Sequence, residues 1–101
     1  MIETFVLCFF LTPSEFNCDW TIYYIDDHDF FLYALSDYNI DNYTVGLAIY
    51  HTKTIVISKQ FENSTDWDGN DVLRHEFKHA YLYERWKANG AVGNCPCHFH
   101  P

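Results

Sequence analysis

The chain has 101 residues, of which 49% are hydrophobic and 20% aromatic, so one domain with a buried core is expected and a disordered chain is excluded. The formal net charge is −8, and no Lys or Arg precedes Lys53, whereas eight of the 14 acids do. Because such a surface repels phosphate backbones, direct nucleic-acid binding is not expected.

The first half of the chain predicts strands. Residues 4–11 form an apolar run that ends at a turn signal, and residues 18–25 are rich in β-branched and aromatic residues. Residues 30–36 are ambiguous between helix and strand, and we interpret them as a strand. Residues 43–58 contain two β-prone runs on either side of a polar turn at 51–53, which predicts a hairpin.

One long helix is predicted over residues 71–88. Several helix-starting residues precede it, and Asn89 with Gly90 forms a C-terminal stop. Strands followed by one helix and an irregular tail predict a single α+β domain over residues 1–101, with a mostly antiparallel sheet of several strands.

The four cysteines are Cys8, Cys18, Cys95 and Cys97, and three pairings of them are possible. The apolar run near the start has no preceding positive region and no following cleavage site, so it does not match a signal peptide. It is also too short to span a bilayer. We therefore expect an intracellular, cytoplasmic protein with reduced thiols and no membrane partner.

The predicted helix contains His75 and His79 with Glu76 between them. Four residues advance a helix by about 400°, a net offset of about 40°, so both imidazoles project from one face and can bind one Zn²⁺. Glu76, about 100° from His75, can act as the general base for a zinc-bound water. The prediction is thus a zinc site with catalytic Glu76. The alternative is two exposed histidines on an amphipathic helix.

A catalytic zinc usually has a third protein ligand. Glu84 lies about 140° around the helix from the second histidine and points away, and no acid follows it in the sequence. We favour His98 as the third ligand because a neutral imidazole leaves zinc more Lewis acidic than a thiolate does, and His100 is the alternative. Cys95 and Cys97 are further candidates, and with these histidines they could instead form a second, structural metal site.

Two stretches resemble the SprT-like zinc metallopeptidases, which belong to the zincins. They are GLAIYHTKTIVISKQF at residues 46–61 and VLRHEFKHAYLY at residues 72–83. The matching positions are Gly46, Ile55, Ile57, Ser58, His75, Glu76, His79, Ala80, Tyr81 and Leu82. The ImmA/IrrE-like metallopeptidases are similar over the same stretch, but their third ligand is a downstream acid, whereas the SprT-like third ligand is a histidine.

The resemblance implies a small zincin-like domain in which His75 and His79 bind zinc and Glu76 is the general base. It also implies that the strand around residues 46–50 holds a peptide or protein substrate by strand addition. Family members that cut DNA-crosslinked proteins carry a basic surface, which this acidic chain lacks. The predicted function is a zinc-dependent metallopeptidase, and the alternative is a non-enzymatic acidic zincin-like module or inhibitor that engages a basic partner.

Overall fold

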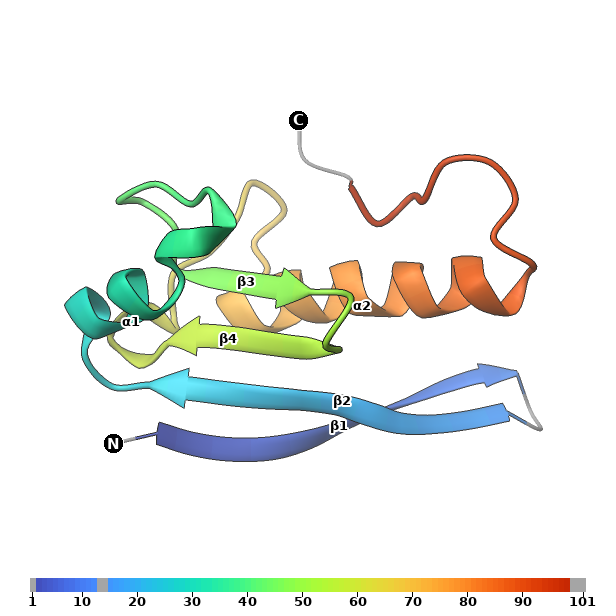
Figure 1. Cartoon of the computed structure of the whole chain (residues 1–101), viewed down its shortest axis with the longest axis horizontal. Coiled ribbons are helices and arrows are strands. Elements are labelled where there is room, and N and C mark those ends of the chain that lie inside the picture. Colours follow the sequence, from blue (N-terminus) through green and yellow to red (C-terminus); the bar gives the residue numbers. More distant parts are fainter. Residues whose placement is uncertain (1, 13–14, 99–101) are drawn as a thin grey trace.

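The computed structural model describes residues 2–12 and 15–98, and within them the predicted α+β class is confirmed. Figure 1 shows a mixed sheet with one main helix beside it and a tail after the helix. The strands are β1 (Ile2–Thr12), β2 (Glu15–Ile25), β3 (Gly46–Ile49) and β4 (Thr54–Ser58). Their order in the sheet is β1-β2-β4-β3. The β1–β2 and β3–β4 pairs are antiparallel, as expected, but β2 pairs with β4 in parallel.

The helical elements are α1 (His28–Ala34), η1 (Ser36–Tyr38), η2 (Lys59–Phe61) and α2 (Val72–Ala88). The helix expected over residues 71–88 is therefore confirmed. Its N-cap is Asp71, whose side chain accepts a hydrogen bond from Arg74 N at 2.9 Å, and its last turn carries Arg85 and Lys87. Among the described residues, no helix is both long enough and apolar enough to cross a membrane.

The strand expected over residues 30–36 is wrong, because this stretch forms most of α1. Asp27 caps the helix by accepting a hydrogen bond from Asp29 N. Phe31 and Leu35 are buried four residues apart, which places both on one helical face. Because residues 30–35 are nearly all apolar, the four-residue spacing that is typical of a helix does not stand out in the sequence.

The core has two layers, one on each face of the sheet. Ile55 and Ile57 of β4 pack with Trp20 and with α2, whereas Val56, which points the opposite way, packs with Phe31 and α1. Strand β4 is therefore buried on both faces. This fixes α2 against the sheet and brings its first half beside the edge strand β3.

The expectation of reduced thiols is wrong, because all four cysteines are paired, as Cys8–Cys18 and Cys95–Cys97. The β1–β2 hairpin brings Cys8 and Cys18 side by side, with 4.0 Å between their Cα atoms. Cys95 and Cys97 form a disulfide with each other, so in this state they do not supply the thiolates that a second metal site would need. The cellular compartment stays a prediction.

Candidate metal centre

Helix α2 places His75 and His79 one turn apart, and both are buried, with His79 against the C-terminal segment at Cys97. Their Nε2 atoms face each other at 3.2 Å. A ligand atom of each histidine and a carboxylate oxygen of Glu76 all lie within 4.8 Å of one another. The four-residue spacing has thus produced a compact cluster and not a pair of exposed surface histidines.

The other ring nitrogen of each histidine faces an oxygen that only accepts hydrogen bonds. His75 Nδ1 donates to the carboxylate of Asp66 at 2.7 Å, and His79 Nδ1 donates to the backbone carbonyl of Cys97. Both Nδ1 atoms therefore carry a hydrogen, and in neutral rings both Nε2 atoms present lone pairs. A proton or a metal ion between or beside them would relieve the repulsion of two lone pairs that face each other at 3.2 Å.

The geometry and the donor types fit zinc. Two nitrogens that each lie about 2.0–2.1 Å from a tetrahedral ion are about 3.3–3.4 Å apart. The observed 3.2 Å between the Nε2 atoms of His75 and His79 is close to that value. Asp66 and the Cys97 carbonyl supply the outer hydrogen bonds that orient metal-binding imidazoles in many zinc proteins.

Asp66 lies in the loop before α2, and hydrogen bonds from other residues of this loop hold its carboxylate in place. Burial alone would raise the pKa of its carboxyl group, but hydrogen bonds from His75, Asn70 and Asp68 outweigh this effect and lower the pKa well below its usual range. Asp66 is therefore an ionised, pre-oriented acceptor for His75.

Glu76 is 7% exposed and lies against the edge strand. Burial raises the pKa of its carboxyl group to about 8, although a hydrogen bond from the backbone N–H of Ala48 acts in the opposite direction. The carboxyl group therefore holds its proton more tightly than an exposed glutamate does. A side chain of this kind suits proton transfer near neutral pH.

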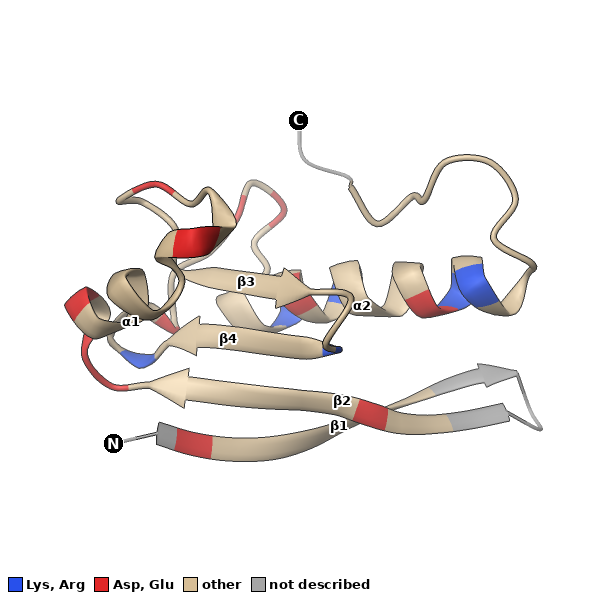
Figure 2. Cartoon of the chain, in the orientation of Figure 1, with Lys and Arg blue, Asp and Glu red and all other residues tan. Residues whose placement is uncertain are grey.

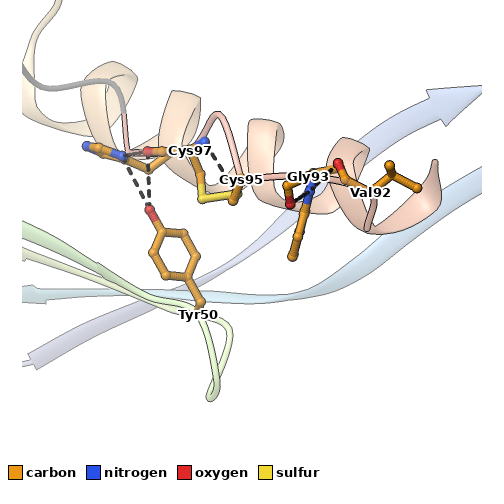
Figure 3. Close-up of a disulfide and its surroundings, with 7 residues drawn as sticks. Tyr50, Val92, Gly93, Cys95 and Cys97 are labelled. Atoms are coloured by element: carbon orange, nitrogen blue, oxygen red, sulfur yellow. Dashed lines mark hydrogen bonds between the residues drawn. A yellow bond between two sulfur atoms is a disulfide. The ribbon is translucent and has the colours of Figure 1, made fainter. Parts of the chain in front are cut away.

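Tyr50, in the turn after β3, makes a further polar contact with His79. Its hydroxyl lies 3.3 Å from His79 Nδ1. It also donates to the Cys97 carbonyl at 3.4 Å (Figure 3). Burial, followed by the negative charge of Glu76, raises the pKa of Tyr50 to about 12. The hydroxyl therefore stays protonated and remains a donor.

Two cavities adjoin this cluster, and Gly46 and Glu76 line both. One also contains His75 and Asp66, and the other contains His79. The cluster thus lies beside two cavities at the edge of β3.

Gly46 is needed for the close approach of β3 to α2. A Cβ at this position would lie 2.6 Å from Cγ1 of Val72 and 3.1 Å from Cγ of Glu76. We expect Gly46→Ala to lower the free energy of unfolding by about 1–3 kcal/mol, as overpacked sites do. Urea unfolding measures this, with Thr52→Ala in the exposed turn as control. A Gly46→Ala variant as stable as the control would contradict the close packing.

The structure places His98 at the rim of this site. It lines the cavity that contains Glu76 and His79, and its ring lies 5.6 Å from that of Tyr50. Among the described residues, the compact cluster consists of His75, Glu76 and His79, so His98 as third ligand stays a prediction. His100 lies outside the described residues. Glu84 points away, as expected, and accepts a hydrogen bond from Trp20 Nε1 at 2.9 Å.

Sequence reasoning missed the residues that orient the histidines. Asp66 is one of the helix-starting residues before α2, and a carboxylate shortly before such a helix is the signal that could have indicated its role. Cys97 contacts His79 through its backbone carbonyl, and because every residue has one, the sequence cannot indicate this contact. Tyr50 lies 29 residues from His79, and only the turn of the β3–β4 hairpin brings them together.

Comparison with known proteins finds no family model, no curated protein and no solved structure that matches this chain. The resemblance to SprT-like metallopeptidases therefore stays a prediction from the sequence stretches quoted above.

Proposed function

We propose that the protein is a zinc-dependent metallopeptidase. The observation that carries this proposal is the facing pair of Nε2 atoms at 3.2 Å, each on a ring whose Nδ1 donates to an oxygen acceptor. A buried glutamate beside them adds the base that hydrolysis requires and that purely structural zinc binding does not.

Zinc, when bound, would lower the pKa of a bound water molecule and polarise the carbonyl group of the peptide bond. His75 and His79 would hold it through Nε2. The carboxylate of Glu76 takes the proton from the attacking water and then gives it to the nitrogen of the departing amine. Ala48 N–H keeps that carboxylate aimed at the cluster, and Asp66 keeps the ring of His75 in the tautomer that presents Nε2.

Edge strand β3 supports a peptide as the substrate. It is the last strand in the order β1-β2-β4-β3, and Val45 O accepts a hydrogen bond from Ser58 N of β4 at 2.9 Å. Because alternate residues face the neighbour in an antiparallel ladder, Gly46 and Ala48 turn their backbone groups away from β4. Ala48 N–H already donates to Glu76, so a peptide would pair with the Gly46 backbone groups and the Ala48 carbonyl. An extended peptide can pair with this edge next to Glu76.

The test is cleavage of a mixture of unstructured peptides by zinc-loaded protein. We expect hydrolysis that stops when a chelator removes the metal and returns when zinc is restored. Full zinc occupancy without cleavage of any peptide would contradict the proposal.

A second candidate function is an acidic module that binds a basic protein. Figure 2 shows that acidic residues gather over α1, η1 and the adjoining loops. The exposed acids of that segment are Asp26, Asp27, Asp29, Asp37 and Asp41. We expect binding of a polylysine peptide that weakens steeply with added salt and is the same in Glu76→Gln. Affinity that does not change with ionic strength would count against this function.

A further inference from the structure

The segment after α2 turns back over the helix and reaches the candidate metal centre (Figure 1). Trp86 Nε1 donates to the carbonyls of Val92 at 3.2 Å and Gly93 at 3.3 Å, which fastens the returning chain to the helix. The segment then buries Cys97, which is 1% exposed. The described part of the tail is therefore attached to the helix at Trp86 and to the site at Cys97.

A disulfide shapes the end of this segment. Cys95 and Cys97 are bonded across Pro96, and the backbone N–H of Cys97 also donates to Cys95 Sγ at 3.3 Å (Figure 3). The ring so closed fixes the peptide plane of Cys97. Its carbonyl accepts hydrogen bonds from His79 Nδ1 and from Tyr50 Oη.

We propose that Cys97 is a positioning residue of the metal centre and that the Cys95–Cys97 disulfide makes zinc affinity depend on redox state. This inference rests on the proposed zinc site. The oxidised segment holds the Cys97 carbonyl against His79 Nδ1, which fixes the tautomer that offers Nε2 and makes that nitrogen a better donor. When the disulfide opens, the ring that holds this carbonyl is lost.

A dithiol reductant is the reaction partner. Its thiolate attacks Cys95 Sγ, because Cys95 is half-buried whereas Cys97 is buried. The S–S bond breaks and Cys97 leaves as a thiolate, which takes up a proton. The second thiol of the reductant then displaces Cys95, so two electrons and two protons pass to the protein and the reductant closes its own disulfide.

The test compares zinc dissociation constants, measured by competition with a chromophoric chelator. The Cys95→Ser/Cys97→Ser variant removes the disulfide and both thiols. The matched control, Cys8→Ser/Cys18→Ser, removes the disulfide of the β1–β2 hairpin. We expect the first variant to bind zinc about 10–100-fold more weakly than wild type, as loss of an outer-shell partner does, and the control to match wild type. The NMR signal of the His79 Nδ1 hydrogen should shift only in the first variant.

A second measurement avoids any folding defect of the double variant. In the Cys8→Ser/Cys18→Ser background, dithiothreitol can reduce only the Cys95–Cys97 bond. Equal zinc affinity before and after reduction would overturn the inference while leaving the zinc site intact. Tighter binding on reduction, with thiolate absorption in the cobalt-substituted protein, would also overturn it. Absence of zinc binding by oxidised wild type would refute the proposed function, and this inference with it.

Discussion

Glu76→Gln should abolish peptide hydrolysis while leaving zinc bound. The amide has nearly the same shape as the carboxylate but cannot accept the proton of the attacking water, so we expect turnover to fall by about 10²–10⁴-fold. Burial already raises the pKa of Glu76 to about 8, which means that the site disfavours the charged form. We therefore expect a neutral glutamine to be tolerated in the fold. Zinc content and turnover are measured on the same sample.

Glu62→Gln is the matched control for this experiment. Glu62 follows η2 and lines a different cavity, with Glu3 and Lys59, so its replacement should leave turnover unchanged. Turnover of Glu76→Gln equal to that of the control would remove the general-base role. Loss of zinc together with activity would instead make Glu76 a metal ligand and not a base.

Zinc should raise the thermal unfolding midpoint of wild type and not that of His79→Ala. A ligand present at 100 times its dissociation constant stabilises the folded state by about 2.7 kcal/mol. For a domain of this size each kcal/mol shifts the midpoint by about 4–8 °C, so we expect a rise of roughly 10–20 °C. His79→Ala removes one of the two Nε2 donors and should abolish the shift. Differential scanning calorimetry with and without zinc measures both.

His51→Ala is the matched histidine control, because His51 is exposed in the β3–β4 turn and is not part of the cluster. It should keep the full zinc-dependent rise. If His79→Ala kept the same rise as His51→Ala, zinc would be binding elsewhere on the chain.

The spacing of His75, Glu76 and His79 could be interpreted from sequence because helical geometry depends only on distance along the chain. The caps of α2 are equally local signals, and the helix appears where they predict it. The β3–β4 hairpin was predictable for the same reason, since its strands are joined by a short turn.

What could not be predicted depends on contacts between distant parts of the chain. The parallel pairing of β2 with β4 brings together strands separated by α1, η1 and β3. Asp66 and Cys97 reach the two histidines from opposite directions along the chain, and the second does so through its backbone. Residues 30–34 are helical and not a strand because Phe31 and Leu35 are buried on one helical face.

The most direct test is a crystal structure of the zinc-soaked protein, with anomalous scattering recorded on both sides of the zinc absorption edge. The account predicts one anomalous peak between His75 Nε2 and His79 Nε2, about 2.0–2.1 Å from each. An ion bound anywhere else at saturating zinc, or none while the two rings still face each other, would contradict it.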